Sequence, residues 1–544
     1  MAETSSGTTL HWLARSRTIA APGFNRWLVP PCALAIHLCI GMAYGFSVFW
    51  LPLSRAIGIA NPVVCKTMTL AQSLTTTSCD WRVSDLVWTY TLFFVVLGAS
   101  AALWGGWVER EGPRRAGVVA AFCWCGGMAI SAIGVSVHQL WLVWLGSGVI
   151  GGIGLGLGYL SPVSTLIKWF PDRRGMATGM AIMGFGGGAM IGSPLADLLM
   201  KQFSSPVTVG VWQTFLTLAC GYFVFMMAGA FGYRVPAEGW APAGWKAPLT
   251  DQGLRSAFNV HLRDAHRTPQ FWLIWTVLLL NVSASIGIIG VASPMLQEIF
   301  GGRLIGAPLV GFTAFDDGQR KAAAAVGAGF VGLISLFNIG GRFFWASLSD
   351  RIGRKPLYAL MLALGAVLYS LAAPTFAGAN LALFILAFCI IASMYGGGFA
   401  AVPAYLADIF GTRFVGAIHG RLLTAWSTAG IIGPLLVAYA RDSRIDAGVA
   451  RDAVYQPIYL VLAAMLAVGF VANLLVKPVA ARFHMTDDPA PLEAGSGPQS
   501  STSESHPVKT GGTNLQLILA WAAVGIPVAW GVYMTAQKAI ILLK

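Results

Sequence analysis

Apolar stretches long enough to cross a lipid bilayer recur along most of the chain. A membrane-spanning helix needs about 20 predominantly apolar residues, and its backbone must satisfy its hydrogen bonds within the helix. The chain has 56% hydrophobic and 10% charged residues, whereas about 25% of the residues of a soluble domain are charged. An all-α polytopic membrane protein is therefore predicted. Twelve spans are expected at residues 27–53, 84–107, 116–137, 140–166, 175–200, 210–233, 268–298, 323–347, 356–374, 378–407, 417–440 and 454–476.

A thirteenth apolar stretch, residues 514–541, follows a polar segment rich in Pro, Ser and Gly that is typical of a flexible linker. The first run is too long for the core of a signal peptide and lacks a clear cleavage pattern, so we expect it to remain as the first helix. The expected organisation is an N-terminal segment, a six-helix bundle, a central loop, a second six-helix bundle, a tail and an extra helix. These parts cover residues 1–26, 27–233, 234–267, 268–476, 477–513 and 514–544.

The basic residues indicate how the chain crosses the membrane. The formal net charge is +13, and Lys and Arg favour the loops on one side of the predicted spans by almost two to one. The positive-inside rule then predicts that the N-terminus and the tail are cytoplasmic. The same rule explains the positive charge without a nucleic-acid partner. We expect a monomer in the cell (inner) membrane, with the lipid bilayer around it.

A charged motif follows the second span of each predicted bundle. Residues 105–114 read Gly-Gly-Trp-Val-Glu-Arg-Glu-Gly-Pro-Arg, and residues 346–355 read Ala-Ser-Leu-Ser-Asp-Arg-Ile-Gly-Arg-Lys. The order acid-Arg-x-Gly recurs at equivalent places, so the halves are predicted to be parallel repeats about an axis along the membrane normal. We interpret both copies as cytoplasmic turns that orient and gate the bundles. The residues involved are Gly105, Glu109, Arg110, Gly112, Arg114, Asp350, Arg351, Gly353 and Arg354.

One arginine, Arg342, lies well inside the eighth predicted span. An arginine within hydrocarbon costs a few kcal/mol on insertion scales, so it needs a partner or a purpose. It precedes Asp350 by eight residues, or about 12 Å along a helix, which is too far to reach water easily. No acidic residue is predicted at the same depth, although a backbone carbonyl could serve. We favour an anionic ligand, because a guanidinium holds a carboxylate by two parallel hydrogen bonds.

The doubled motif, the long central connector and the twelve spans resemble the major facilitator superfamily. Three stretches are further similar to the oxalate/formate antiporter family, within a resemblance that covers about residues 27–476. These stretches are Tyr159 to Pro162 with Lys168 to Gly179, Asn338 to Arg342, and Gly420 to Trp426. The resemblance implies two six-helix bundles related by a pseudo-two-fold axis. It also implies secondary active transport of small organic carboxylates such as formate, oxalate or a 2-oxo acid.

The resemblance also implies roles for individual residues. An arginine at the place of Arg342 is the family's substrate-binding cation. In the oxalate carriers of the family a lysine in helix eleven holds the second carboxylate, but here the matching residue is Trp426. One fixed cation matches one carboxylate, which favours a monocarboxylate over oxalate. The other residues expected to line the site are Asn338, Tyr159, Tyr44, Tyr395 and Trp426.

Two further features allow alternative interpretations. Cys65 and Cys79 lie in one polar loop and would form a disulfide if that loop faces an oxidising compartment. His37 in the first span is interpreted as a hydrogen-bonded core histidine, with lining of the cavity as the alternative. The extra helix resembles a small one-helix protein that accompanies transporters of this kind. No cofactor and no metal site are expected, because the cysteines show no metal-ligand spacing.

An alternating-access carrier is the function predicted from these residues. Closing the site around an unpaired arginine would bury a bare charge, so exchange of anions is predicted over net flux. Two alternatives stay open, a non-transporting sensor or receptor for a carboxylate and a proton-coupled monocarboxylate symporter. The absence of acidic residues from the middle of the spans argues against a carboxylate proton relay. An enzyme is not expected, since no set of nucleophile, base and metal is apparent.

Overall fold

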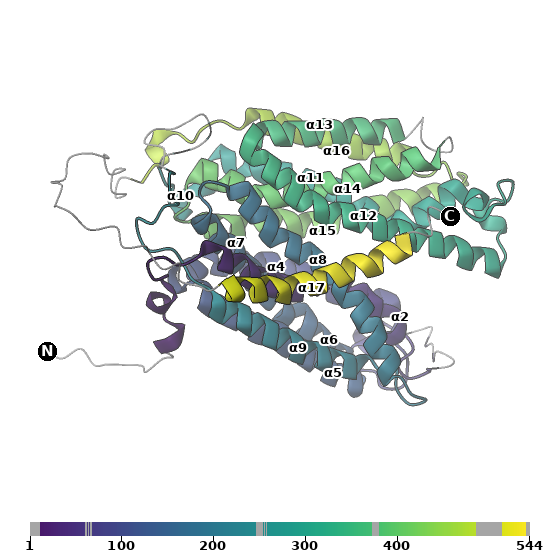
Figure 1. The fold of residues 1–544 in the computed structure, drawn as a ribbon. Helices are drawn as coiled ribbons and strands as arrows, with labels where there is room; N and C mark the ends of the chain where they lie inside the picture. Colours follow the sequence, from purple (N-terminus) through teal and green to yellow (C-terminus); the bar gives the residue numbers. More distant parts are fainter. Residues whose placement is uncertain are drawn as a thin grey trace, which may run out of the picture.

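The computed structural model of the protein describes residues 11–59, 63, 65, 68–245, 254, 256, 258–372, 380–485 and 514–539. The first ten residues, part of the predicted central loop and the predicted tail from residue 486 to residue 513 lie outside these ranges. Long helices dominate the described residues, which contain no β-strand (Figure 1). The predicted all-α membrane class is confirmed.

The first bundle is the lower one in Figure 1. Its first span is interrupted, because a 3₁₀ segment, η4, separates two α-helical pieces, and its fourth span contains a π-helical segment, η5. The first span consists of η3 (Arg26–Leu28), α1 (Val29–Ile40), η4 (Gly41–Phe49) and α2 (Trp50–Leu53). The other elements are α3 (Leu70–Ser73), α4 (Val83–Glu111), α5 (Pro113–Ser136), α6 (Leu140–Val143), η5 (Trp144–Gly151), α7 (Gly152–Trp169), α8 (Arg174–Phe203) and α9 (Val211–Gly232).

The second bundle has the same architecture and lies above the first in Figure 1. Several of its helices begin at side-chain caps. Thr268 accepts a hydrogen bond from the N–H of Phe271 at the start of α11, and Asp316 forms a capping box at the start of α12. The elements are α10 (Leu262–Ala265), α11 (Pro269–Phe300), α12 (Asp317–Ile352), α13 (Arg354–Leu371), α14 (Leu381–Phe410), α15 (Val415–Asp446) and α16 (Gln456–Leu475), followed by the extra helix α17 (Asn514–Ala539).

Twelve helical segments of the described residues are long and apolar enough to cross a bilayer. The extra helix α17 is one of them, whereas α13, the ninth span of the predicted set, is not. The reason is that α13 is described over 18 residues and begins with Arg354 and Lys355. With α13, the arrangement is the predicted two six-helix bundles plus a thirteenth helix.

Both copies of the acid-Arg-x-Gly motif end a helix. The acidic residue and the arginine still belong to α4 and α12, and the chain turns at a single glycine, Gly112 or Gly353. Both glycines have φ of 89°, a backbone conformation that side chains disfavour. The turns are therefore shorter than predicted. The acid and the first arginine of each copy project from the last turn of a helix, whereas Arg114 and Arg354 belong to the first turn of the next one. We call the end of the molecule that carries both turns the basic end.

The two bundles meet along two equivalent helix pairs. The second helix of each bundle packs on the fifth helix of the other, so that α4 contacts α15 and α12 contacts α8. Glycines permit the close approach. A β-carbon on Gly105 would lie 2.9 Å from the α-carbon of Ala417, and one on Gly179 would lie 2.8 Å from the carbonyl oxygen of Arg342. We call these two helix pairs, α4 with α15 and α12 with α8, the seams, and they enclose the centre of the molecule.

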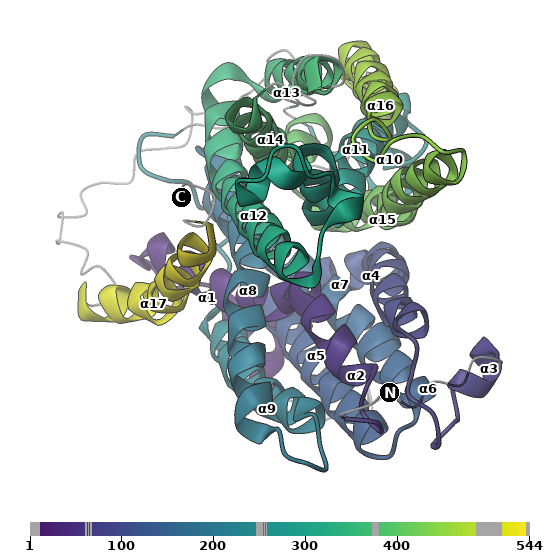
Figure 2. The same ribbon diagram turned by 90° about the vertical axis from the view of Figure 1, so that its right-hand side faces the viewer.

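Helix α17 crosses the seam between α8 and α12 on the outside of the molecule (Figures 1 and 2). Near its start the indole of Trp521 donates a hydrogen bond to the carbonyl of Trp27, at 3.2 Å, in the first bundle. Further along, Gly531 lies against α8, and Thr535 lies against Gly332 of α12. The extra helix therefore contacts both bundles.

Candidate functional site

The guanidinium of Arg342 is buried between the two bundles, and 1% of the residue is exposed. Its Nε donates to Asn338 Oδ1 at 3.2 Å, and its Nη1 donates to the carbonyl oxygen of Ile182 in α8 at 2.9 Å. Among the described residues, Nη2 has no hydrogen-bond partner and no carboxylate forms an ion pair with Arg342. An amide and a carbonyl leave the positive charge uncompensated. Within the part of the chain that the structure describes, the centre of the molecule therefore holds a cation without a counter-ion.

Two glycines hold the Arg342 side chain in a narrow slot. A β-carbon on Gly186 of α8 would lie 2.9 Å from Cζ, and one on Gly396 of α14 would lie 3.0 Å from Cγ. Asn338 supports the same slot, because its amide donates to the carbonyl of Ala392 at 3.1 Å while its oxygen accepts from Arg342. Both ends of Asn338 are thus used within the protein. Its role in the structure is to orient Arg342.

Three aromatic rings face the guanidinium and two more pack against those three, and we call the five the aromatic cage: Tyr44, Tyr159, Phe185, Phe399 and Trp426. The guanidinium carbon lies 5.8, 5.8 and 6.0 Å from the ring centroids of Tyr44, Phe399 and Phe185. The ring centroid of Trp426 lies 4.7 Å from that of Phe399 and 5.9 Å from that of Tyr159. Aromatic faces attract cations, so the cage offsets part of the cost of the buried charge.

Four polar atoms near this cation are buried without a hydrogen-bond partner in the described residues. They are the hydroxyl groups of Tyr44, Tyr159 and Tyr395 and the indole nitrogen of Trp426. Buried polar groups are normally paired, and each unpaired one calls for an explanation. A ligand with a carboxylate for Arg342 and further acceptors for these donors would provide the missing partners.

The basic end is closed by acidic side chains that cap helices of the opposite bundle. Asp350, in the last turn of α12, accepts hydrogen bonds from the backbone N–H groups of Gly175 and Met176 at the start of α8, both at 2.8 Å. It also pairs with Arg354 at 2.6 Å. The N-terminus of a helix favours a negative charge. This contact therefore ties the second bundle to the first.

Glu109 makes the equivalent contact in the opposite direction. Its Oε1 accepts from the N–H of Gly416 at the start of α15, at 3.0 Å, and its Oε2 pairs with Lys168 at 2.5 Å. A third connection is made by Asp408, which pairs with Arg174 of the first bundle at 2.9 Å and with Arg354 at 3.1 Å. The acids of both motif copies thus join the bundles at the basic end.

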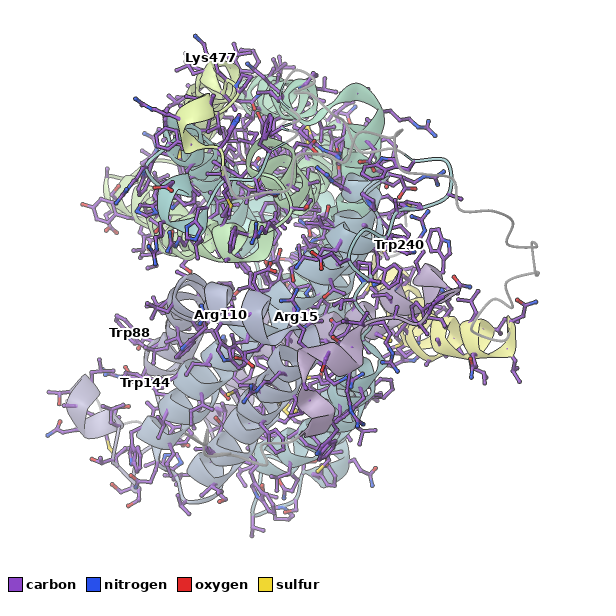
Figure 3. All side chains as sticks on the ribbon, turned by 90° about the vertical axis from the view of Figure 1, so that its left-hand side faces the viewer. Arg15, Trp88, Arg110, Trp144, Trp240 and Lys477 are labelled. Carbon is purple, nitrogen blue, oxygen red and sulfur yellow. A yellow bond between two sulfur atoms is a disulfide. The ribbon has the colours of Figure 1, made fainter. Side chains whose placement is uncertain are left out.

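The basic residues of the two motif copies lie in different surroundings. Arg110 and Arg351 are exposed at the basic end, where Figure 3 shows Arg110 together with Arg15. Arg354 pairs with the acid of its own copy, whereas Arg114 donates to the carbonyl of Trp12 at 3.0 Å instead. The two halves are therefore not symmetrical in their basic residues.

The profile of the Major Facilitator Superfamily matches residues 33–315 and 317–541. The chain belongs to this superfamily. It is 26% identical over 412 residues, 75% of this chain and 83% of the relative, to the oxalate:formate antiporter of Oxalobacter formigenes. It is 24% identical over 434 residues, 77% of this chain and 78% of the relative, to monocarboxylate transporter 11 of Homo sapiens.

A solved structure of a Major Facilitator Superfamily transporter, FucP in the outward conformation, has the same fold. The TM-score is 0.56 at 14% identity, over 84% of this chain and all of that one. The superfamily membership confirms the predicted resemblance and agrees with a transporter rather than an enzyme. The assignment of individual residues to the site depends on the geometry described above.

The loop before α4 in this major facilitator chain is held by a disulfide between Cys65 and Cys79, at the end opposite the basic end. Asp80 supports it by accepting hydrogen bonds from the N–H groups of Ile57, Gly58 and Val63, at 2.7 to 2.9 Å. The loop lies away from Arg342 and the aromatic cage. The disulfide is therefore structural rather than part of the site.

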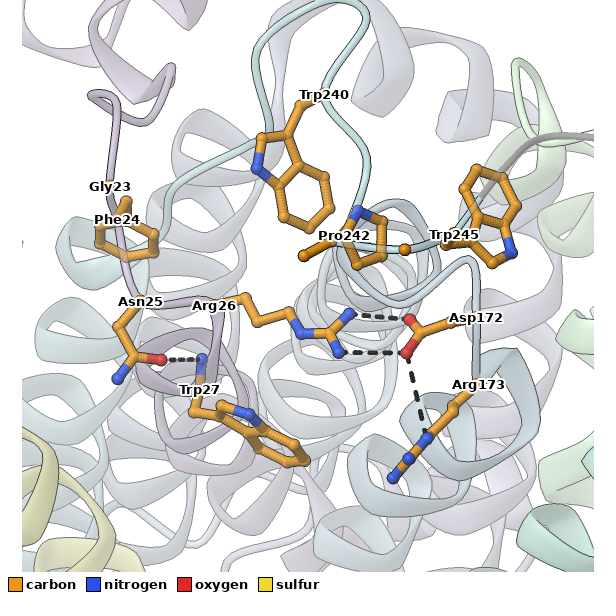
Figure 4. A pocket seen from close by; sticks show the side chains of 12 residues that line it. Gly23, Phe24, Asn25, Arg26, Trp27, Asp172, Arg173, Trp240, Pro242 and Trp245 are labelled. Carbon is orange, nitrogen blue, oxygen red and sulfur yellow. Dashed lines mark hydrogen bonds and ion pairs between the residues drawn. The ribbon is translucent and has the colours of Figure 1, made fainter. Parts of the chain in front are cut away.

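A pocket of about 810 Å³ opens at the basic end, apart from the Arg342 site (Figure 4). Arg26 and Asp172 form a double hydrogen bond across it, at 2.7 and 3.0 Å, and Trp240 and Trp245 cover it. This pair joins the segment before α1, which carries Arg26, to the turn between α7 and α8, which carries Asp172. In the described residues no group of three or more potential metal ligands is present here or elsewhere.

Sequence reasoning missed several members of the site. Phe185 and Phe399 contact Arg342, yet single phenylalanines in apolar helices carry no signal that separates a ligand wall from ordinary packing. His419 was also missed, although its ring centroid lies 5.7 Å from that of Tyr159. Gly186 belongs to the glycine-rich helix α8, and nothing in the sequence separates the glycine that faces the guanidinium from the other glycines of this helix. Only the packing of the helices against one another distinguishes these positions.

Proposed function

We propose that this chain is a secondary active transporter that exchanges small organic monocarboxylates, of the formate or 2-oxo acid class, by alternating access. The observation that carries the proposal is the buried Arg342 guanidinium without a carboxylate partner in the described residues. Four unpaired donors accompany it. The names of the two relatives, an oxalate:formate antiporter and a monocarboxylate transporter, support the same class of substrate.

The size and charge of the substrate follow from what surrounds Arg342. One guanidinium can neutralise one carboxylate by a bidentate pair. Within the described residues no second cation contacts the aromatic cage, and Trp426 contributes a ring and one N–H donor instead. A second carboxylate would then remain buried and unpaired, which is costly. The cage therefore favours a small monocarboxylate, with an oxo oxygen as a suitable acceptor for the tyrosine hydroxyl groups.

The contacts at the basic end are proposed to form the cytoplasmic gate in the inner membrane. Asp350 and Glu109 each cap a helix of the opposite bundle, and Asp408 pairs with Arg174 across the same boundary. All three connections must break when the site opens to this side. Since the two caps are equivalent in the two halves, a rigid rotation of one bundle against the other would release them together.

The exchange mode follows from the charge of the empty site. Reorientation without substrate moves a guanidinium that lacks a counter-ion through the closed state, whereas reorientation with substrate moves a neutral pair. The second process is cheaper in a medium of low polarity. Preloaded vesicles should therefore take up labelled substrate faster than empty vesicles.

The test uses the full chain in proteoliposomes with formate, pyruvate, lactate and oxalate in counterflow. Arg342→Ala should abolish uptake, whereas Arg263→Ala, an exposed arginine at the basic end, should leave it unchanged. Normal transport by Arg342→Ala would remove Arg342 from the site. Binding of a carboxylate without any flux would instead identify a membrane sensor on this scaffold.

A further inference from the structure

His419 of α15 is a buried histidine whose Nδ1 has no hydrogen-bond partner in the described residues, and 1% of the residue is exposed. The other buried histidine beside Tyr159 is different. His37 places Nδ1 2.6 Å from the carbonyl oxygen of Ala181 and Nε2 3.2 Å from that of Tyr159. A buried polar atom without a partner costs free energy, so native structures rarely keep one without a reason. A partner that arrives in another state of the transport cycle would provide that reason.

The His419 side chain lies where α15 meets the first bundle, directly below the aromatic cage. Helix α15 packs on α4 and α7 at this boundary (Figure 2). Trp426 follows His419 by seven residues, so both side chains lie on the same face of the helix, about 10 Å apart along its axis. Both rings pack on Tyr159 of α7, with centroids 5.7 Å away for His419 and 5.9 Å away for Trp426. Tyr159 therefore connects the cage to His419.

The contacts of the proposed gate lie on the other side of His419. Gly416, three residues earlier in α15, donates its backbone N–H to Glu109 at 3.0 Å. A β-carbon on Gly416 would lie 2.8 Å from Cβ of Ser164, which follows Tyr159 by five residues towards the basic end. His419 thus lies between Tyr159 at the cage and Gly416 at the gate. An anion that moves between α7 and α15 passes His419 before it reaches Glu109.

A neutral imidazole at this place is able to hold a carboxylate loosely. With its proton on Nδ1, it donates one hydrogen bond to a carboxylate oxygen. The Arg342 guanidinium binds the anion more strongly, because it supplies a charge and two parallel N–H groups. A carboxylate that left Arg342 for a route without any donor would be buried and unpaired, which is costly. One neutral donor lowers this cost without trapping the anion.

We propose that His419 is a second contact for the carboxylate, reached after the anion leaves Arg342 for the cytoplasmic gate and, in the opposite direction, before it arrives there. The inference rests on the proposed function and extends its site along one route. His419 stays neutral throughout, so the charge that the bundles move with and without substrate is the charge already given for exchange. The unpaired Nδ1 belongs to the state with a closed gate, and it finds its partner when the gate opens.

Two substitutions separate the hydrogen bond of His419 from the packing of its ring. His419→Phe keeps a ring against Tyr159 but has no donor, whereas His419→Asn loses the ring and keeps an amide N–H close to the place of Nδ1. Exchange of labelled pyruvate is measured in inverted membrane vesicles, which expose the basic end to the medium. Equilibrium dialysis of the purified full chain measures binding of the same anion. Thr428→Val is the control, because the Thr428 hydroxyl donates to the carbonyl of Thr424 within α15, at 2.8 Å.

His419→Phe should raise the KM for pyruvate in inverted vesicles about fivefold, as expected for the loss of one hydrogen bond. Its dissociation constant for pyruvate should equal that of the wild type, because Arg342 and the aromatic cage are intact. His419→Asn and Thr428→Val should keep the KM of the wild type. His419→Gln, whose amide lies close to the place of Nε2, is a second variant with a donor, so the inference does not depend on the folding of one replacement.

The opposite order, with a normal KM in His419→Phe and a raised KM in His419→Asn and His419→Gln, would show that the ring only packs against Tyr159. An equal rise of KM in His419→Phe and in both variants with a donor would likewise overturn the inference, since the N–H group would then make no difference. Either result leaves the proposed function standing. Absence of binding and exchange of all tested carboxylates in the wild type would overturn the proposed function itself.

Discussion

Gly186 lies so close to Arg342 that a β-carbon on it would be 2.9 Å from both Cζ and Nε of the guanidinium. A single methyl group at this position must therefore displace the charge from its bonds to Asn338 and Ile182. We expect Gly186→Ala to lower carboxylate uptake about tenfold or more, which corresponds to about 1.4 kcal/mol. Counterflow in proteoliposomes measures the effect. Gly290→Ala is the control, because a β-carbon on Gly290 in α11 would meet nothing within 4 Å. Equal transport by both variants would show that the slot around Arg342 tolerates a shift of the guanidinium.

The cap that Asp350 provides for α8 should hold the proposed cytoplasmic gate closed. Asp350→Asn removes a charge and one acceptor from a site with two backbone donors and Arg354, at a cost of about 1–3 kcal/mol. The gate should then open more often. The probe is Ser164→Cys in a chain without its free cysteines, because Ser164 is buried against Gly416 just inside the gate.

Labelling of this probe in inverted vesicles by a membrane-impermeant thiol reagent should become several times faster with Asp350→Asn. The control is Asp197→Asn, which breaks only the exposed pair between Asp197 and Lys201. If both variants label at the same rate, the contact of Asp350 with α8 does not control the gate.

Trp426 occupies the position at which the resemblance to oxalate carriers expects a lysine. Its ring lies within 6.3 Å of the ring of Tyr44, and its Nε1 has no partner in the described part of the chain. Trp426→Lys would add a second cation to the aromatic cage. We expect uptake of oxalate to rise and uptake of formate and pyruvate to fall, each several-fold, in competition assays. Trp426→Phe keeps a ring without a donor, so it should lower uptake without a change of preference.

The fold of this chain is predictable from its sequence because the bilayer leaves few choices. Apolar runs of the required length must be helices, and the repeat around Glu109 and Asp350 relates the two halves by sequence alone. The details at the motif were not predictable. The turn shrinks to Gly112 or Gly353, and the acids before it, Glu109 and Asp350, find their partners while still helical. Those partners, such as Gly175 and Gly416, are backbone groups of the other bundle, which no local pattern reveals.

The positive charge of the candidate site was predictable from the sequence, whereas the arrangement of the side chains around it was not. Arg342 is conspicuous as a cation inside an apolar span, and the ring of Tyr44, one of the tyrosines predicted beside it, lies 5.8 Å from the guanidinium carbon. The interpretation of Asn338 changed, since both ends of its amide are occupied by Arg342 and Ala392. His37 could be recognised as a core histidine, but its two carbonyl partners come from α7 and α8. Contacts between spans depend on packing, which the apolar pattern alone does not determine.

The loop that contains the disulfide should lose stability in mild acid. His138 Nε2 donates a hydrogen bond to the carbonyl oxygen of Cys79 at 2.9 Å, and the His138 ring stacks on that of Trp81 at 4.0 Å. Burial lowers the pKa of His138 below its usual 6.5. A lowered pKa means that the folded loop prefers the neutral imidazole, so its contribution is present above pH 6.5 and is lost as the pH falls further. The melting temperature of the wild type should therefore fall between pH 7 and pH 5 by more than that of His138→Asn, a replacement that tolerates the φ of 50°.

Equal pH profiles of wild type and His138→Asn would show that His138 does not control this loop. Reduction of the Cys65–Cys79 disulfide at pH 7 is a separate test of the same region. It should lower the melting temperature without changing the relative uptake of formate and oxalate, since the loop lies away from the aromatic cage.

Helix α17 contacts α8 and α12 beyond the level at which these two helices touch at Arg342. A β-carbon on Gly531 would lie 2.9 Å from Cγ1 of Ile191 in α8, and Thr535 lies beside Gly332 of α12. Rotation of one bundle against the other changes the distance between α8 and α12, so α17 must shift in every cycle. We expect removal of residues 486–544 to speed up exchange several-fold, with the substrate affinity unchanged, because this rearrangement is no longer required.

A pair of glycines within α17 separates this effect from a general loss of stability. Gly531→Leu would push α17 away from α8, whereas Gly525→Leu places the same side chain where nothing lies within 4 Å. The first variant should reproduce the faster exchange of the truncated chain, and the second should behave as wild type. Slower exchange in the truncated chain would mean that α17 supports the moving bundles instead of restraining them. Because α17 touches α8 through a glycine and α12 through a threonine, the contact is close on both sides and a single leucine suffices to break it.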